Sequence, residues 1–465
     1  MKIKIYLIDP IVSEINNEIM VSTPNQGSYG SGAPSGIWEP YTMECIGSFL
    51  KENLPILDIH ILQENIYDHD RIVSKLKFDH DLNVVCVSTY SYAANDVISI
   101  FEKIKDIDNE IITVSGGYHP SGDENFCQNS CIDHCILGEG EIQMLNLIKS
   151  LTGSEFKNDE NFKLNMGENS PWPIRNEKFL KRAKSFPLSV PSPDKQINPA
   201  MISYGRGCLF NCSFCASSLI WSDTHTSFRN VSDVINEINY LKKKFGTNSL
   251  FWTDLALNND KNKLYELLYD LSKLNNIYSF GYVNQNLDDE TAFKLQNAGF
   301  RRLGFGVEAL ENYRLKKIKK FQKLSRIKKS LSAADRNGII TRGYIMMGFP
   351  DQVPEDTYNI LENIIDLPID QLRLGFYTPF VGTSSYEEHC DNLTEDNNRF
   401  TADLPVFKNH ILEEEKWISI RKDVIKRFYN SENYKNRIEE KIKEFPYLEE
   451  SFNYFFKVLN LEEVL

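Results

Sequence analysis

The segment AMISYGRGCLFNCSFCASS, residues 200–218, determines how the rest of the chain is interpreted. Its first six residues are mostly apolar and predict a short strand. The loop that follows holds three cysteines within eight positions, Cys208, Cys212 and Cys215, with no second pair of cysteines or histidines nearby. A strand that leads directly into a loop of closely spaced thiols indicates a ligand site at the carboxyl end of that strand.

The number of thiols limits which metal centre this loop can hold. Structural zinc takes four ligands in tetrahedral geometry, usually as two close pairs, so a lone triplet is a poor zinc site. A 4Fe-4S cube can be held by three thiolates, and the CxxxCxxC spacing lets one loop reach three of its corners. The fourth iron then stays open to a substrate or a cofactor.

Strand and helix signals alternate over residues 199–390 and predict a partial (β/α)6 barrel. The candidate strands are residues 200–205, 249–254, 278–284, 301–308, 340–348 and 370–379. Amphipathic helices such as 231–245 and 288–299 lie between them. Chemistry in such barrels collects in the loops at the carboxyl ends of the strands, and the cysteine triplet lies in the first of these loops.

The rest of the chain predicts three further parts. Residues 1–151 alternate apolar runs with helical stretches, which is typical of a doubly wound, Rossmann-like parallel sheet. VSTYSY (87–92), VSGGYHPS (114–121) and GEGE (138–141) follow three of its strands, where ligands of such sheets bind. Residues 152–198 are polar and proline-containing and predict a linker. Residues 391–465 are charged and helical, and we expect them to form a helical cap on the barrel.

Length and charge narrow the class of protein. A chain of 465 residues is long for one domain, so two or three are expected. The net charge of -13 disfavours nucleic acid and anionic membranes as partners. The start of the chain does not read as a signal peptide and no apolar run is long enough to span a bilayer, so we expect a cytoplasmic protein. Its nine cysteines are then ligands or simply buried, rather than a disulfide framework.

The triplet and its surroundings resemble the radical S-adenosylmethionine (SAM) superfamily. The hallmark of that family is CxxxCxxC with an aromatic residue before the last cysteine, which Phe214 supplies here. Residues 300–310 and 343–352 are similar to the fourth and fifth barrel strands of the family, and 377–388 to the stretch after the sixth. The resemblance implies that the open iron binds SAM and that the reduced cluster cleaves it to a 5′-deoxyadenosyl radical, with an external one-electron reductant of the flavodoxin or ferredoxin type.

By matching positions, the resemblance also assigns residues that contact SAM. Lys320 would pair with the SAM carboxylate, and the other expected contacts are Phe214, Asn284, Glu308, Met346 and Gly348. The cofactor carries the hard chemistry, so these residues are expected to position it and to keep water out.

The amino-terminal domain resembles the cobalamin-binding subgroup of radical SAM enzymes. The residues expected to surround the corrin and its nucleotide tail are Ser88, Thr89, Gly116, Gly117, Tyr118 and Gly138. The DxHxxG motif that supplies a cobalt ligand in many cobalamin proteins is absent, because its nearest match, DIHILQ (58–63), lies inside a predicted strand and ends in glutamine. The resemblance therefore implies cobalamin without a protein histidine on the cobalt, or a retained domain that has lost the cofactor.

Four other cysteines are candidates for a functional role. Cys127, Cys131 and Cys135 are evenly spaced, but their segment passes from a helix into a strand, so ordinary burial is expected ahead of a second cluster. Cys390 follows the sixth barrel strand, where loops face the barrel mouth, and we consider it as a hydrogen donor to a substrate radical.

Three functions remain open from the sequence. The first is a cobalamin-dependent methyltransferase that methylates an unactivated carbon of a small-molecule or peptide substrate. The second is a radical SAM enzyme without methyl transfer, such as a peptide epimerase, a cyclase or a rearrangement catalyst, with a degenerate cobalamin domain. The third is a non-catalytic sensor that binds a cluster or cobalamin, which the complete set of SAM-like barrel segments disfavours.

Overall fold

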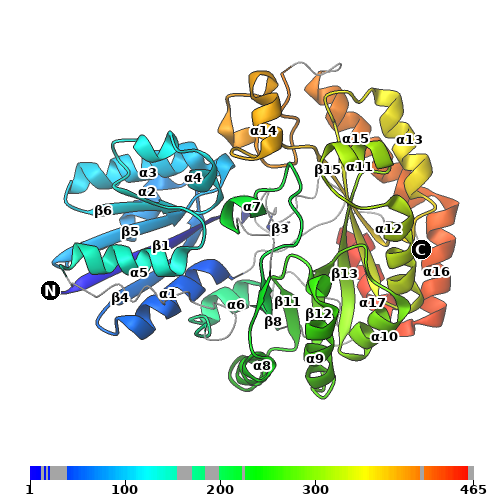
Figure 1. Ribbon diagram of the computed structural model, residues 1–465, viewed down its shortest axis with the longest axis horizontal. Helices are drawn as coiled ribbons and strands as arrows, with labels where there is room; N and C mark the ends of the chain where they lie inside the picture. The colour runs from blue at the N-terminus through cyan, green and yellow to red at the C-terminus, as the bar shows by residue number, and fades with distance from the viewer. Residues whose placement is uncertain are drawn as a thin grey trace.

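The computed structural model describes residues 1–11, 15–16, 19–20, 39–153, 170–183, 198–221, 226–408 and 413–458. It contains two parallel sheets side by side, the amino-terminal one at the left of Figure 1 and the barrel at the right. Most of the predicted linker lies outside the described residues. The described part of it contains a short helix, α6 (Glu177–Ala183). This helix was not predicted, because the sequence there shows no sustained periodicity.

The amino-terminal sheet is doubly wound, as predicted. Its strands run in the order β4-β1-β5-β6-β7 and are all parallel. Their bounds are β1 (Ile3–Ile11), β4 (Asp58–Asn65), β5 (Leu82–Ser88), β6 (Ile112–Gly116) and β7 (His134–Ile136). A small antiparallel pair, β2 (Ile15–Asn16) and β3 (Ile19–Met20), follows β1. The strand order reverses beside β1, which is where sheets of this kind bind ligands.

Helices cover both faces of this sheet. One apolar core lies under α1 (Tyr41–Asn53) and α5 (Gly140–Leu151). The other lies under α2 (His69–Ser74) and α3 (Ala94–Ile107). The short helix α4 (Tyr118–Gly122) begins directly after β6. Strands buried on both faces explain the nearly continuous apolar runs of the sequence.

The second sheet has six parallel strands in the order β15-β14-β13-β12-β11-β8, which confirms the predicted partial barrel. The strands are β8 (Pro199–Ile202), β11 (Ser249–Trp252), β12 (Tyr278–Val283), β13 (Phe300–Glu308), β14 (Ile340–Met347) and β15 (Gln371–Phe376). The helices between them are α8 (Val231–Phe245), α9 (Lys261–Leu271), α10 (Asp289–Asn297), α11 (Asn312–Lys317), α12 (Leu324–Arg336) and α13 (Pro354–Ile364).

Strand β13 shows how the barrel strands divide their side chains. Leu303, Phe305 and Val307 are fully or almost fully buried in the core formed with the surrounding helices. Because side chains alternate along a strand, the positions between them, Arg302 and the glycines that follow, face the barrel interior. The interior of this barrel is therefore not filled by branched apolar side chains.

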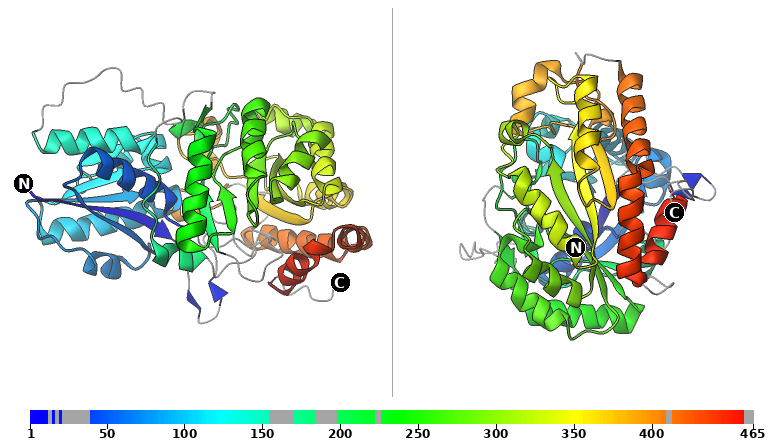
Figure 2. Two further views of the ribbon diagram at one scale, coloured as in Figure 1. Left: turned by 90° about the horizontal axis from the view of Figure 1, so that it is seen from below. Right: turned by 90° about the vertical axis from the view of Figure 1, so that its right-hand side faces the viewer.

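The carboxyl-terminal segment is helical, as predicted, and comprises α15 (Glu414–Asn430), α16 (Glu432–Glu444) and α17 (Glu449–Val458). The short helix α14 (Ser384–His389) precedes it, at the end of the predicted barrel. Helices α15, α16 and α17 lie along the edge of the barrel at β15 and not over the mouth (Figures 1 and 2). Tyr429 of α15 accepts a hydrogen bond from the Leu372 backbone N–H at 2.9 Å. Phe452, Phe455 and Phe456 of α17 are buried, as their spacing predicted, whereas Tyr454 is exposed; residues 459–465 lie outside the described range.

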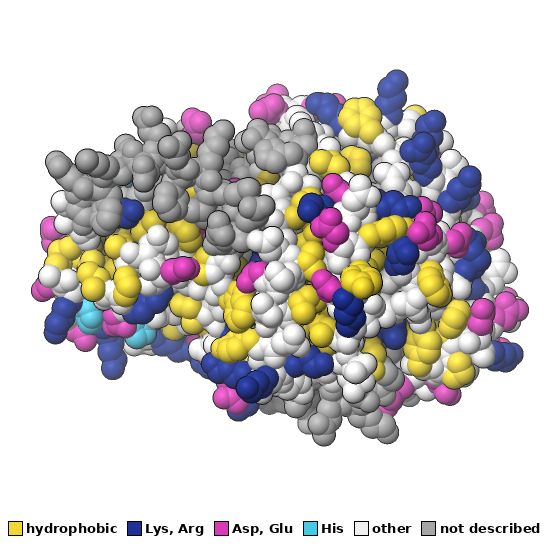
Figure 3. Space-filling view, turned by 60° about the horizontal axis from the view of Figure 1, so that its bottom comes forward, with side chains coloured by type: hydrophobic (Ala, Val, Ile, Leu, Met, Phe, Trp, Pro, Cys, Tyr) yellow, Lys and Arg dark blue, Asp and Glu magenta, His cyan; other side chains and the backbone are white. Residues whose placement is uncertain are grey.

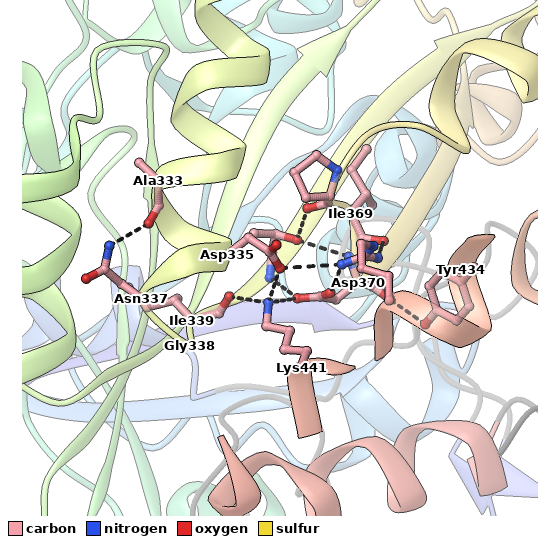
Figure 4. A network of polar contacts seen from close by, with 12 residues as sticks. Ala333, Asp335, Asn337, Gly338, Ile339, Ile369, Asp370, Tyr434 and Lys441 are labelled. Carbon is pink, nitrogen blue, oxygen red and sulfur yellow. Dashed lines mark hydrogen bonds and ion pairs between the residues drawn. The ribbon is translucent and has the colours of Figure 1, made fainter. Parts of the chain in front are cut away.

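A polar network fixes α16 to the amino ends of β14 and β15 (Figure 4). Lys441 Nζ lies 2.6 Å from Asp370 Oδ2 and 2.7 Å from Asp335 Oδ1, and donates to the Ile339 carbonyl at 2.9 Å. The Tyr434 hydroxyl donates to the Asp370 carbonyl at 2.8 Å. Nearby cations, chiefly Lys441, outweigh the burial of Asp370 and lower its pKa, so the carboxylate stays charged.

The surface carries charge of both signs. On the face drawn in Figure 3, acidic and basic side chains are interspersed over the described residues. None of the described helices is both long and apolar enough to cross a membrane.

Candidate functional site

The first candidate site is a cavity of about 300 Å³ at the carboxyl ends of β5, β6 and β7. The barrel closes its other side with Gly205, Arg206 and Gly207, which follow β8, and with Trp221 after α7 (Ser217–Ile220). Five of the six residues predicted to surround a corrin line this cavity, namely Ser88, Gly116, Gly117, Tyr118 and Gly138. The cavity therefore lies between the two sheets.

The sixth predicted residue, Thr89, does not line the cavity. Its side chain is fully buried, its hydroxyl lies 2.7 Å from Ser115 Oγ, and its backbone N–H donates to the Gly116 carbonyl at 2.6 Å. Thr89 thus holds the ends of β5 and β6 together behind the cavity. Thr89 faces away from the cavity because side chains alternate along a strand. Its neighbour Ser88 therefore faces the cavity and Thr89 does not.

The cavity wall depends on glycine at the β6–α4 turn. Gly117 has a φ of 102°, and a Cβ there would lie 3.2 Å from the Thr89 carbonyl oxygen and 3.3 Å from Ser88 Oγ. Gly138, after β7, has a φ of 76° and donates its N–H to Ser121 Oγ at 3.0 Å. Bare backbone at two strand ends, facing a mostly apolar lining, fits a large flat ring and the polar tail attached to it.

Histidine is absent from the described residues that line this cavity or the second one described below. His119, which follows Gly117 by two positions, is buried and packs its ring against Phe126 at 4.8 Å. Burial lowers the pKa of His119 to about 4. A cobalamin in the first cavity would thus meet no imidazole from the described lining.

The cysteine loop lies at the carboxyl end of β8, as predicted, and the barrel holds it on two sides. The Ser213 N–H donates to the Ile318 carbonyl after α11 at 3.0 Å, and its hydroxyl accepts from Ser385 of α14 at 2.7 Å. A short antiparallel pair, β9 (Gly205–Arg206) and β10 (Ser227–Phe228), frames the loop. The loop that carries the thiols is therefore hydrogen-bonded to a residue between β13 and β14 and to a residue after β15.

The donor set of this loop fits a cluster better than a single ion. Cys212 is buried and Cys208 and Cys215 are partly buried, and burial raises the pKa of the Cys212 thiol to about 12. Within the part of the chain that the structure describes, no three cysteine, histidine or acidic side chains come close enough to share one metal ion. A 4Fe-4S cube does not need such convergence, because each thiolate binds a different iron.

An ion pair stands beside the cysteine loop at the carboxyl end of β13. Glu308 has a φ of 63°, unusual for a residue other than glycine, and its Oε1 lies 2.9 Å from Lys320 Nζ. Burial opposes the charge of Lys320, but Glu308, followed by the Cys212 thiol, outweighs it and raises the Lys320 pKa. Two of the six residues predicted to contact SAM thus lie together, within electrostatic reach of the thiols.

The other predicted SAM contacts surround the same end of the barrel. Asn284 follows β12 and is buried, and its Oδ1 accepts from Asn258 Nδ2 at 3.0 Å. Phe214 and Met346 pack against one apolar cluster around Tyr377. Gly348 follows β14 with a φ of 72° and donates its N–H to Gln352 Oε1 at 2.6 Å.

A second cavity of about 620 Å³ runs from the mouth into the barrel interior. Cys215 lines it, together with Phe400 and its two successors from the carboxyl-terminal segment. Tyr41, Tyr90 and Tyr118 line both cavities, so the two adjoin. The structure thereby brings the cysteine loop and the glycine-lined strand ends to neighbouring cavities.

Sequence reasoning missed the most polar part of the second cavity. Its lining includes the buried side chains of Arg302, Arg342 and Arg373, and the hydroxyls of Tyr282 and Tyr344. Arginines and tyrosines inside otherwise apolar strands, such as Arg342 and Tyr344 two positions apart in β14, are the signal that could have revealed them.

Two expectations about the remaining cysteines were wrong. Cys127 and Cys135 form a disulfide, with their Cα atoms 5.9 Å apart, and only Cys131 is a buried free thiol as expected. The chain turns between the two positions and brings them together, which spacing along the sequence did not indicate. Cys390 is exposed and lines neither cavity, because α14 carries it past the mouth onto the surface.

The two halves of the site are joined by a buried chain of ion pairs. Arg175, from the described part of the linker, lies 2.6 Å from Glu39 before α1 and 2.6 Å from Glu237 of α8. Arg229 lies 2.7 Å from the other oxygen of Glu237. Closer to the first cavity, Arg206 lies 2.8 Å from Glu141 of α5. These contacts hold the amino-terminal sheet against the barrel.

Comparison with known proteins gives matches to both parts of the chain. The family profile of the Radical SAM superfamily matches residues 202–364, and that of the B12 binding domain matches residues 32–148. An uncharacterized methyltransferase of Pyrococcus horikoshii is 24% identical over 388 residues, which cover 79% of this chain and 83% of that protein. The anaerobic magnesium-protoporphyrin IX monomethyl ester cyclase of Rubrivivax gelatinosus is 23% identical over 412 residues, 83% of this chain and 72% of that protein.

One solved structure has the same two-part fold. The radical S-adenosylmethionine methyltransferase TsrM from Kitasatospora setae, with cobalamin and a [4Fe-4S] cluster bound, matches with a TM-score of 0.61. It is 16% identical, and the match covers 84% of this chain and 79% of TsrM.

The barrel, its CxxxCxxC loop and the adjoining Rossmann-like domain define an enzyme that cleaves SAM with an iron-sulfur cluster. Residues 202–364 form a domain of the Radical SAM superfamily, and residues 32–148 form a B12 binding domain. Its cofactors are a 4Fe-4S cluster, SAM and cobalamin.

Proposed function

We propose that this enzyme transfers a methyl group to an unactivated carbon of its substrate. One observation carries the proposal: the glycine-lined cavity of the first domain and the cavity beside the cysteine loop adjoin across Tyr41, Tyr90 and Tyr118. A substrate in the second cavity would lie between a methyl carrier and a radical source. The Pyrococcus horikoshii relative and TsrM are both named methyltransferases, which supports methyl transfer.

Each cofactor has a proposed set of residues. Cys208, Cys212 and Cys215 hold the cluster, and SAM is held by Phe214, Asn284, Glu308, Lys320, Met346 and Gly348. Cobalamin is held by Ser88, Gly116, Gly117, Tyr118 and Gly138. When bound, the cluster and SAM supply the 5′-deoxyadenosyl radical and cobalamin supplies the methyl group, with electrons from an external reductant of the flavodoxin or ferredoxin type.

The protein's own part in the reaction is placement and exclusion of water. The ion-paired Lys320 offers a cation to the SAM carboxylate, while Glu308 can accept a hydrogen bond from the SAM amino group. The tyrosines shared by the two cavities bring apolar rings to the boundary where the substrate carbon would lie. Fixing the partners at this boundary makes the transfer effectively intramolecular, an advantage worth up to about 7–11 kcal/mol for well-aligned groups.

Product analysis tests the proposal. The reconstituted enzyme, given SAM labelled in its methyl group, a reductant and a small-molecule or peptide substrate, should form S-adenosylhomocysteine and 5′-deoxyadenosine in comparable amounts. The label should appear on a carbon of the substrate. Deoxyadenosine formed with a converted but unlabelled substrate and no S-adenosylhomocysteine would reject methyl transfer.

A further inference from the structure

The interior of the barrel is cationic where an apolar filling is usual. Arg302, Arg342 and Arg373 occupy inward positions of three adjacent strands, β13, β14 and β15. Their exposed fractions are 1%, 2% and 8%. Interiors of such barrels are dominated by branched apolar residues, and arginine is rarely buried to this extent. Three buried guanidinium groups around one cavity indicate a binding function.

The strand register brings the three side chains to neighbouring levels of the cavity. Arg342 is the register partner of Gln371, and Tyr344 is the register partner of Arg373. Arg302 Nη1 donates to Gln371 Oε1 at 3.3 Å, which spans from β13 to β15. The guanidinium groups therefore belong to one polar zone.

Electrostatics in this zone favour an added negative charge. Burial, followed by the nearby charge of Arg342, lowers the pKa of the Arg302 guanidinium to about 9. Arg373 Nη2 lies 3.3 Å from Asp403 Oδ1, so one guanidinium already faces a carboxylate. Burial and the charge of Arg342 both disfavour the charged form of Arg302, and an anion bound between the arginines would favour that form.

The space beside the arginines suits an organic molecule. Gly304 lies between Arg302 and the mouth, and a Cβ at Gly304 would lie 2.6 Å from the ring of Tyr282. The hydroxyls of Tyr282 and Tyr344 lie 3.3 Å apart on the cavity wall. Phe251 of β11 and Phe280 of β12 stack beside them, with ring centroids 5.1 Å apart. Hydroxyls and aromatic rings thus lie next to the cationic zone.

The same cavity reaches the cysteine loop. Its lining includes Cys215, Ala216 and Ser217 at one end and the three arginines deeper in the barrel. A molecule whose charged end lies on the arginines therefore extends toward the place where the radical would form.

We propose that the substrate carries an organic anion, a carboxylate or a phosphate group, that binds Arg302, Arg342 and Arg373 inside the barrel. This inference rests on the proposed function, because it takes the second cavity as the place of the substrate. The arginines fix the charged end of the substrate and leave the rest of the molecule to project toward the mouth.

Anion binding to the cofactor-loaded enzyme tests this proposal. The protein is reconstituted with its cluster, loaded with cobalamin and saturated with SAM without a reductant, so that SAM stays intact. Inorganic phosphate and succinate are then titrated by calorimetry as the two probes. At least one probe should bind, and Arg302→Gln and Arg342→Gln should each weaken its binding by about tenfold or more, the loss expected for one charge-assisted contact. Tighter binding of phosphate assigns a phosphate group, and tighter binding of succinate assigns a carboxylate.

The control is Arg301→Gln, which changes the adjacent residue. Arg301 faces Tyr447, with 5.2 Å between its guanidinium carbon and the ring centroid, and does not line the cavity. Arg342→Lys, which keeps the charge, should retain part of the binding even if Arg342→Gln folds poorly. Failure of both probes to bind, or equal losses in the control, would overturn the proposal.

SAM provides a further arm of the same experiment. If the anion binds the SAM-free protein and SAM abolishes this binding, the arginines hold the SAM carboxylate and the proposal is wrong. The titration measures no methyl transfer, so an enzyme that proves not to be a methyltransferase can still pass this test.

Discussion

At the residue scale, the most direct expectation concerns the cysteine loop. Cys212→Ala removes a buried thiol that the proposed cluster needs, so iron content should fall and SAM cleavage should drop below detection. Iron analysis and 5′-deoxyadenosine formation measure both. Cys390→Ala, which alters an exposed thiol, is the control and should leave iron content unchanged. Full iron content in Cys212→Ala would remove that cysteine from the ligand set.

A buried carboxyl group sets an expectation for pH. Burial, followed by the neighbouring Glu39, raises the pKa of Glu44 above its ordinary value of 4.5. The folded state therefore keeps a proton that the unfolded chain loses, so this group lowers stability as pH rises above about 4.5, by at most about 1.4 kcal/mol per pH unit. Glu44→Gln should flatten that decline in urea unfolding. Glu52→Gln, on the exposed side of the same helix, should leave it unchanged, and an unaltered slope in Glu44→Gln would contradict the assignment.

Single residues also show what the sequence could reveal about the site. The cysteines were predicted from their spacing, and Glu308 and Lys320 from the resemblance to the radical SAM superfamily. The structure brings all of them to one end of the barrel. Thr89 was misplaced because a strand end does not reveal which side a given residue faces. The partners of Arg175 could not be predicted, since Glu39 and Glu237 are far from it in sequence and meet it only when the two sheets pack.

At the scale of elements, the turn from β6 into α4 should decide cobalamin binding. Gly117→Ala adds a Cβ against the Thr89 carbonyl at a positive φ, so the turn must shift and the protein should retain less cobalamin after loading and desalting. Gly153→Ala is matched to it, because Gly153 also has a positive φ but a Cβ there meets no atom within 4 Å. Equal cobalamin retention in the two variants would contradict a role for this turn.

The attachment of α16 gives a second expectation at this scale. Asp370 is fully buried and pairs with Lys441 and Arg437, so Asp370→Ala leaves two cations facing a buried gap. Breaking such a network costs about 3–5 kcal/mol. Urea unfolding should show this loss, whereas Asp366→Ala, at an exposed position nearby, should change stability little. A loss below about 1 kcal/mol would show that the network is not needed for the fold.

The elements themselves were predictable for a physical reason. A parallel strand that helices cover on both faces is apolar along its length, so the amino-terminal strands stand out from the helices between them. The barrel strands stand out by the apolar residues that face the surrounding helices. The face of each barrel strand that turns inward was not predictable, because alternation separates two sets of residues without saying which set the helices cover. That is why the interior arginines were missed, although each lies inside a predicted strand.

At the scale of the whole molecule, Arg175 should couple the stabilities of the two sheets. Arg175→Met leaves Glu39 and Glu237 buried without their common cation, at a cost of about 3–5 kcal/mol. Unfolding by urea should move to lower concentration and separate into two transitions, since the contact between the halves is weakened. Arg326→Met, on the exposed face of α12, is the control. A single unshifted transition in Arg175→Met would show that other contacts join the halves.

The alternation of β13 has a consequence for which carbon is attacked. Arg302 and Glu308 both face the interior and are six residues apart, which is about 20 Å along a strand. If Arg302 binds the charged end of the substrate and Glu308 lies beside the radical source, the distance between them determines which substrate carbon lies next to the radical. The position of attack would then depend on the length of the substrate. A substrate with a longer chain would place a different carbon beside the radical source, although the reacting groups stay the same.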